Sequence, residues 1–183
     1  RSKYVAENEV WVKFGLGEMH ILNNMKVKNV PSPIRTQYQW TGMYKPFDHQ
    51  RVTAEFLTLN KKAFCLSEMG TGKTNSVIWA SDYLMKLGVI KRMLVICPLS
   101  IMDAAWRRDL FRTVMHRSVE IAHGSREKRA AIINGEAEIV IINYDGVEIV
   151  QKEIDAGGFD LIVVDEATHL KNVATKRWKV LNK

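Results

Sequence analysis

The chain has 183 residues, of which 46% are hydrophobic, and it carries a formal net charge of +7. This length suits one main domain with a buried core, and the basic balance is compatible with a polyanionic partner without establishing one. No apolar run approaches the ~20 residues that cross a bilayer, and the charged start lacks a signal-peptide core, so we expect a soluble, cytoplasmic protein without a membrane partner. Cys65 and Cys97 lack the spacing of a zinc site or a disulfide framework.

The first 45 residues have the pattern of a small accessory element. EVWVKF (9–14) and HILNNMKV (20–27) are typical of short strands in a hairpin, and VPSPIRTQ (30–37) has the proline spacing of an extended linker. We therefore expect a strand-rich extension in residues 1–45 and the main domain in residues 46–183.

From residue 46 onward, short β-branched runs alternate with amphipathic segments, which predicts an α/β fold with a mainly parallel sheet flanked by helices. The predicted strands are AFCLS (63–67), RMLVIC (92–97), SVEIAH (118–123), EIVIIN (138–143) and DLIVVD (160–165). The predicted helices, from apolar spacings of three and four, are 48–59, 73–87, 100–114, 125–134 and 144–154.

The segment SEMGTGKT has the spacing of a phosphate-binding loop, although its first position is Ser67 instead of glycine. A predicted strand precedes it and a helix follows, while Gly70 and Gly72 permit a tight backbone. Lys73 supplies a positive charge, and Thr74 offers a hydroxyl to Mg²⁺. The alternative is a chance glycine turn between a strand and a helix.

A second acidic motif supports the phosphate loop. FDLIVVDEATHLKN is a continuous apolar strand that ends in Asp165 and Glu166, as in a Walker-B element. An acidic helix N-terminus would give the same local pattern. Together with the loop, a nucleoside triphosphate and its metal explain the pair better, with Asp165 holding Mg²⁺ partly through water and Glu166 polarising the attacking water.

Four strings, EMGTGKT, VICPLSIMDAAWRRDL, INYDGVE and DEATHLKN, occur in the order of superfamily-two helicase motors. The chain resembles the Swi/Snf-like ATPases among them over residues 46–183. The resemblance implies a RecA-like P-loop NTPase lobe that uses ATP and Mg²⁺ and belongs to a translocase acting on double-stranded DNA. The compact spacing of the motifs is similar to that of bacterial or phage members.

The same resemblance assigns roles to individual residues. Gln50 resembles the glutamine that reads adenine, with Phe47 and His49 as neighbouring packing candidates. The expected phosphate cradle, with Lys73 also catalytic, comprises Met69, Gly70, Thr71, Gly72, Lys73 and Thr74. Asp165 and Glu166 match the metal-binding and water-activating carboxylates.

Positions that would face nucleic acid are also implied. Ser100, with Pro98 and Leu99, lies in motif Ia, and Asn143 and Tyr144 lie in the next motif. A basic cluster follows the acidic motif and includes Lys171, Lys176 and Arg177. A solvated helix face explains this cluster nearly as well as DNA contact does.

Two departures from the family pattern bear on function. Thr168 and His169 stand where relatives have a histidine followed by another residue, which affects the link between the nucleotide and nucleic-acid sites. The second RecA-like lobe, with its arginine fingers, is expected outside these 183 residues, so the chain alone should bind ATP weakly and hydrolyse it poorly. The alternatives are a strand-separating DNA or RNA helicase and an interaction module that does not hydrolyse ATP.

Overall fold

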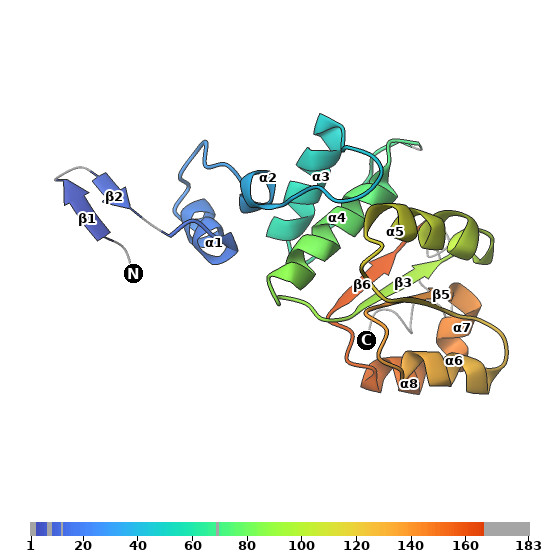
Figure 1. The fold of residues 1–183 in the computed structure, drawn as a ribbon. Coiled ribbons are helices and arrows are strands. Elements are labelled where there is room, and N and C mark those ends of the chain that lie inside the picture. Colours follow the sequence, from blue (N-terminus) through green and yellow to red (C-terminus); the bar gives the residue numbers. More distant parts are fainter. Residues whose placement is uncertain (1–2, 7–8, 12, 69, 167–183) are drawn as a thin grey trace. The chain divides into compact units, whose positions relative to one another are not determined.

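The computed structural model describes residues 3–6, 9–11, 13–68 and 70–166 (Figure 1). The chain divides into two compact units, which are described separately. Unit 1 comprises residues 1–40 and 45–83, and unit 2 comprises residues 41–44 and 84–183. Within the described ranges, no helix combines the length and apolar character needed to cross a membrane.

Unit 1 begins with a hairpin and continues with helices. Strands β1 (Lys3–Ala6) and β2 (Glu9–Trp11) pair antiparallel. The helices are α1 (Leu16–Asn24), α2 (Pro33–Gln37), α3 (Asp48–Leu59) and α4 (Lys73–Lys86), whose last turn enters unit 2. The predicted bounds of α3 are confirmed, and α4 ends one residue earlier than predicted.

Two expectations for the N-terminal extension were wrong. The second predicted strand, residues 20–27, lies largely in helix α1, and β2 instead pairs with the preceding strand β1. The predicted extended linker contains the short helix α2. Pro33 occupies the beginning of α2, where its fixed φ favours a helix and its missing N–H costs nothing, so proline spacing alone did not indicate extended chain.

An aromatic cluster forms the core of unit 1 and joins α2 to α4. Tyr38 packs edge-to-face against Trp40 and Tyr83, with ring centroids 5.3 and 5.7 Å apart, and Trp40 packs likewise against Trp79. The Tyr38 hydroxyl donates a hydrogen bond of 2.6 Å to Asp82, a buried carboxylate on α4. Residues 33–40 are therefore part of the core that supports α4, not a detached linker.

The predicted strand AFCLS is not a strand in this structure. Residues 63–68 have no regular secondary structure, and Phe64 and Leu66 are 82% and 90% exposed. A strand requires a neighbouring strand for its backbone N–H and C=O groups, and neither described sheet includes this segment. β-Propensity indicates which side chains suit a sheet, but it does not supply that partner.

Unit 2 is built on a four-stranded parallel sheet in the order β4-β5-β3-β6 (Figure 1). Its strands are β3 (Met93–Cys97), β4 (Val119–Ala122), β5 (Ile139–Asn143) and β6 (Leu161–Val164). Every residue of β3 and β5 is buried, as continuous apolar runs in a sheet covered on both faces predict. The predicted α/β class and four of the five predicted strands are confirmed.

The helices of unit 2 are more divided than their periodicity suggested. They are η1 (Leu99–Ile101), η2 (Met102–Arg107), α5 (Arg108–Thr113), α6 (Arg126–Ile133), α7 (Tyr144–Ile149) and α8 (Gln151–Ala156). The predicted helix 100–114 is thus a 3₁₀ turn, a π-helical stretch (η2) and an α-helix in succession. The predicted helix 144–154 is interrupted at Val150, which has φ −123°.

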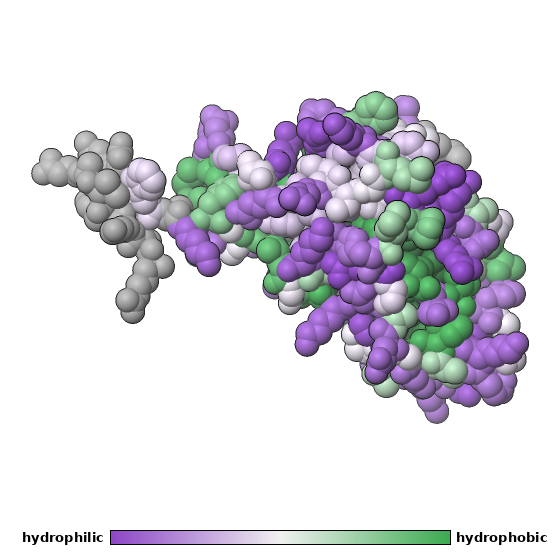
Figure 2. Space-filling view, viewed as in Figure 1, coloured by the Kyte–Doolittle hydropathy of each residue, from purple (hydrophilic) through white to green (hydrophobic). Residues whose placement is uncertain are grey.

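The surface of unit 2 is mixed in character. Figure 2 shows hydrophilic residues interspersed with apolar ones on its viewed face. Large apolar side chains that stay exposed in unit 2 include Leu99, Phe111, Met115 and Ile162. Beneath the surface, apolar residues from β3, β5, α6 and α7 form one continuous core.

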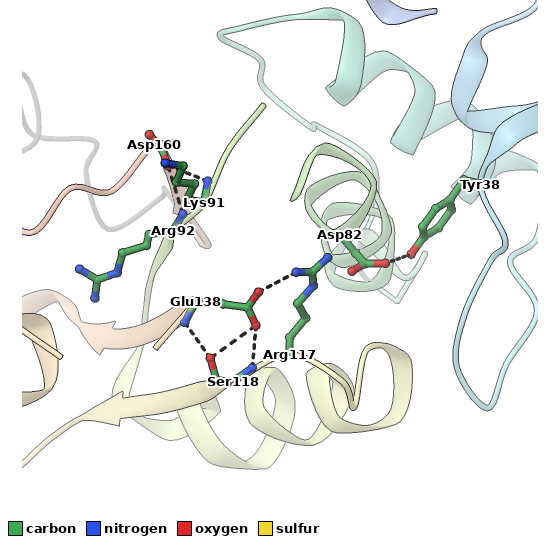
Figure 3. Close-up of polar contacts among 8 residues, drawn as sticks. All are labelled: Tyr38, Asp82, Lys91, Arg92, Arg117, Ser118, Glu138 and Asp160. Atoms are coloured by element: carbon green, nitrogen blue, oxygen red, sulfur yellow. Dashed lines mark hydrogen bonds and ion pairs between the residues drawn. The ribbon is translucent and has the colours of Figure 1, made fainter. Parts of the chain in front are cut away.

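The carboxylates of Glu138 and Asp160 form hydrogen bonds that join neighbouring strands at their N-terminal ends (Figure 3). Glu138 accepts hydrogen bonds of 2.6 Å from Arg117 and 3.0 Å from the Ser118 backbone N–H, which joins the start of β5 to that of β4. Asp160, just before β6, accepts from the backbone N–H groups of Lys91 and Arg92, just before β3. Figure 3 also draws the Tyr38–Asp82 contact of unit 1.

These contacts favour the charged forms of both carboxyl groups. Burial raises the pKa of Glu138, but hydrogen bonds from Ser118 and Arg117 outweigh it and leave the pKa below its ordinary value. Backbone hydrogen bonds from Lys91 and Arg92 lower the pKa of Asp160. A group with a lowered folded-state pKa stabilises the fold above its unfolded pKa, and this contribution disappears as the pH falls through the folded value.

We therefore expect Glu138→Gln to lower the stability of the chain at pH 7 by roughly 1 kcal/mol, because a charge-assisted contact is lost. The difference from the unsubstituted chain should shrink below about pH 4.5, the ordinary value for Glu. Urea unfolding between pH 7 and pH 3 measures it, with the exposed Glu120→Gln as the matched control. A difference that stays constant with pH would contradict the proposed contribution of Glu138.

Candidate functional site

The predicted phosphate loop turns at two glycines in unit 1. Gly70 and Gly72 have φ values of +78° and +75°, in the left-handed region that favours glycine. An added Cβ at Gly72 would lie 2.0 Å from Nε2 of Gln50, whereas nothing lies within 4 Å of that position at Gly70. The backbone conformation of Gly72 therefore favours glycine, and a side chain at this position would displace the amide of Gln50.

Lys73 is the first residue of α4, and its side chain folds back over the loop. The ammonium Nζ donates hydrogen bonds of 2.8 Å to the Ser67 carbonyl and 2.7 Å to the Glu68 carbonyl. Ser67 thus contributes its backbone to the loop in place of the usual glycine. A phosphate placed at this helix N-terminus would meet both the lysine charge and the positive end of the helix dipole.

Helix α3 contributes two side chains to the same loop. The Gln50 amide donates to the Thr71 carbonyl over 3.3 Å, and its oxygen accepts from the Phe47 N–H over 3.0 Å. His49 also contacts the Thr71 carbonyl, at 3.0 Å from Nε2, and its ring is stacked on the exposed Phe47 at a centroid distance of 5.7 Å. The predicted adenine-reading residue is therefore attached to the phosphate loop.

A shallow cavity of about 230 Å³ opens beside the loop. It is lined by His49, Thr53, Ser67, Thr71, Lys73 and Ser76, all from unit 1. These side chains offer hydroxyl groups, an imidazole and one ammonium. Such a set suits a polar, anionic ligand better than an apolar one.

Asp165 follows β6 in unit 2, and several contacts fix it. Its backbone N–H donates to the Ile96 carbonyl over 2.9 Å, which extends the β3–β6 pairing by one residue. The indole N–H of Trp106 donates to Oδ2 over 2.8 Å, and the Tyr144 hydroxyl donates to the Asp165 backbone carbonyl. Asp165, the predicted metal-binding residue, is thus contacted by residues from two other predicted motifs.

Glu166 has a left-handed backbone conformation directly after Asp165. Its φ of +53° is in the left-handed region, which is uncommon for a residue with a side chain, and its N–H donates to Oδ1 of Asp165 over 2.9 Å. Burial raises the pKa of the nearby Cys97 thiol to about 12, and the charges of Asp165 and Glu166 add to this effect. Cys97 is therefore a neutral core residue.

The predicted nucleic-acid residues of unit 2 differ in exposure. Ser100 is exposed on η1. Asn143 and Tyr144 are only 7% and 6% exposed, and Asn143 accepts a hydrogen bond of 2.8 Å from the buried Arg129. Their contact with nucleic acid stays a prediction, but in this structure their side chains support the sheet edge and Asp165.

Two residues that contact the candidate site residues carried no sequence signal: Trp106, which contacts Asp165, and Arg129, which contacts Asn143. Trp106 and Arg129 lie in the predicted helices 100–114 and 125–134, and no sequence motif assigned either of them a role. A buried indole N–H or guanidinium needs a hydrogen-bond acceptor. Trp106 or Arg129 on the buried face of a helix therefore indicates an acceptor elsewhere in the core. Residues Met69, Thr168, His169, Lys171, Lys176 and Arg177 lie outside the described residues.

Comparison with known proteins identifies relatives of this chain. Residues 49–183 match the family described as the SNF2-related domain. The chain is 32% identical over 111 residues to the ISWI chromatin-remodeling complex ATPase ISW2 of Saccharomyces cerevisiae, covering 57% of this chain and 10% of that protein. It is 26% identical over 141 residues to a Bacillus subtilis protein named as the uncharacterized ATP-dependent helicase YqhH, covering 74% of this chain and 24% of that protein.

Solved structures share the fold. The Sulfolobus solfataricus SWI2/SNF2 ATPase core in complex with dsDNA matches with a TM-score of 0.65 and 24% identity, over 78% of this chain and 30% of that chain. The same core domain solved separately matches with a TM-score of 0.59 and 21% identity, over 82% of this chain and 32% of that chain. The chain belongs to the SNF2-related family, and it has the fold of part of a SWI2/SNF2 ATPase core.

Proposed function

We propose that this chain is the ATP-binding first motor lobe of a Swi/Snf-like ATPase that couples hydrolysis to movement on double-stranded DNA. The observation that supports the proposal most directly is the loop at the start of α4, which contains two left-handed glycines and in which Lys73 lines a cavity. The family match includes this loop. Because the chain spans only about a tenth to a quarter of the curated relatives given above, movement on DNA would be an activity of a longer protein.

The chemistry of the donors fits Mg²⁺. Magnesium prefers hard oxygen ligands and keeps several waters, and Thr74 offers a hydroxyl while Asp165 offers a carboxylate. Each carboxylate oxygen of Asp165 accepts one hydrogen bond from the described residues, which leaves further lone pairs for a metal-bound water. When bound, the ion would supply charge neutralisation for a transferring phosphoryl group.

The proposed catalysis is mainly electrostatic positioning. Lys73 would leave the loop carbonyls and neutralise charge on the phosphates, Gln50 would recognise the adenine, and Glu166 would orient the attacking water. An arginine finger from a second lobe contributes on the order of 10³ to 10⁵ in comparable reactions. We assign no such residue within the described ranges, so we expect slow turnover by this chain alone.

The first test is ATP turnover with and without double-stranded DNA, by this chain and by a version fused to a second lobe of the same family. We expect DNA-stimulated turnover in the fused version and little in the chain alone. Strand displacement by the fused version would favour the unwinding helicase. Mg²⁺-dependent ATP binding without turnover in either version would instead favour the interaction module.

Replacing Lys73 tests the loop itself. Lys73→Ala should weaken ATP binding at least tenfold, because it removes the cation that faces the phosphates. Lys86→Ala is the matched control, since Lys86 is exposed in the last turn of the same helix. Calorimetric titration with ATP measures both variants. Unchanged affinity in Lys73→Ala would refute the assignment of the nucleotide site.

A comparison of Gly72→Ala with Gly88→Ala tests the contact between Gly72 and Gln50. Gly72→Ala should also weaken ATP binding at least tenfold, since its Cβ would displace Gln50 as well as strain a left-handed backbone. Gly88→Ala introduces the same kind of strain, at φ +68°, but its Cβ meets nothing within 4 Å. We expect Gly88→Ala to lower stability and leave affinity unchanged. Equal affinities in the two variants would contradict a role for the Gln50 contact.

A further inference from the structure

Trp106 makes a contact that packing alone does not explain. Its side chain is 1% exposed, and its indole N–H points to Oδ2 of Asp165 at 2.8 Å. A buried indole N–H needs an acceptor, but many backbone carbonyls would serve. Here the acceptor is the Asp165 carboxylate, the proposed ligand of Mg²⁺.

The other contacts of Asp165 fix its backbone more than its carboxylate. The hydrogen bond to Ile96 and the one from Tyr144 both involve main-chain atoms of Asp165. The carboxylate oxygens accept hydrogen bonds from Trp106 and from the Glu166 N–H. The Glu166 contact comes from the adjacent residue, whereas the Trp106 contact joins the carboxylate to an element distant in the sequence.

The backbone around Trp106 is also unusual. Residues 102–107 form the π-helix η2 between the 3₁₀ turn η1 and the α-helix α5. A π turn holds one residue more than an α turn, and one extra residue rotates the following side chains by about 100° around the axis. Stretches of π-helix are infrequent and often occur at functional sites. The turn therefore affects where the side chain of Trp106 points.

We propose that Trp106 is a positioning residue that orients the carboxylate of Asp165 for Mg²⁺. This inference rests on the proposed function. A carboxylate has about four acceptor sites, and the contacts from Trp106 and Glu166 use two of them while restricting rotation of the group. Outer contacts of this kind around metal ligands typically change metal affinity by about 10- to 100-fold when removed.

The test measures binding, not turnover. A fluorescent ATP analogue is titrated into the 183-residue chain with Mg²⁺ and, separately, with EDTA, and the ratio of the two dissociation constants gives the Mg²⁺ enhancement. Trp106→Phe keeps an aromatic ring but removes the N–H. We expect it to reduce the Mg²⁺ enhancement roughly tenfold while affinity in EDTA stays unchanged.

Two reference variants make the result specific. Trp79→Phe alters an equally buried tryptophan in the core of unit 1, and it should keep the full Mg²⁺ enhancement. Asp165→Asn removes the charge that Trp106 contacts, and it should lose the enhancement. Adding Trp106→Phe to Asp165→Asn should then cause no further loss, because the two residues act through one carboxylate.

Each remaining outcome counts against the inference. An unchanged Mg²⁺ enhancement in Trp106→Phe overturns it while leaving the proposed function intact. Loss of affinity in EDTA as well, or an equal loss in Trp79→Phe, shows a general structural effect and also overturns it. Absence of nucleotide binding by the unsubstituted chain overturns the proposed function and this inference together.

Discussion

The parallel pairing of β3 with both β5 and β6 is the constraint on which unit 2 depends. Val95 on β3 stands opposite Ile141 on one side and Val163 on the other, so the three strands share one register. Parallel strands bring their carboxyl ends to the same edge of a sheet, and ligands of open α/β sheets bind at such edges. Cys97, Asn143 and Asp165 meet there because of this register, although they are far apart in the sequence.

The same pairing shows which parts of the fold were predictable. Continuous apolar runs such as MLVIC and IVIIN become strands because their flanking helices bury both faces, and that pattern is visible in a single sequence. AFCLS has a similar composition, but the structure gives it no regular secondary structure and neither described sheet includes it. Pairing is a property of two segments, so composition of one segment cannot decide it.

The candidate site was predictable to a similar degree. Glycine spacing and acidic residues after a strand indicated the loop and Asp165, because those chemistries require particular residue types. The π-helical turn at Met102–Arg107 left no such signal, since its residues also suit an α-helix. The burial of Asn143 was missed for a related reason: its partner, Arg129, lies on a helix whose inward side depends on the tertiary fold.

Residues 63–67 have a consequence for handling the chain in solution. Phe64 and Leu66 lie on either side of Cys65 in a segment without regular secondary structure, and their side chains are largely exposed. An exposed apolar segment that belongs to neither described sheet can pair with another copy. Self-association of the chain should therefore depend on these exposed side chains more than on its buried core.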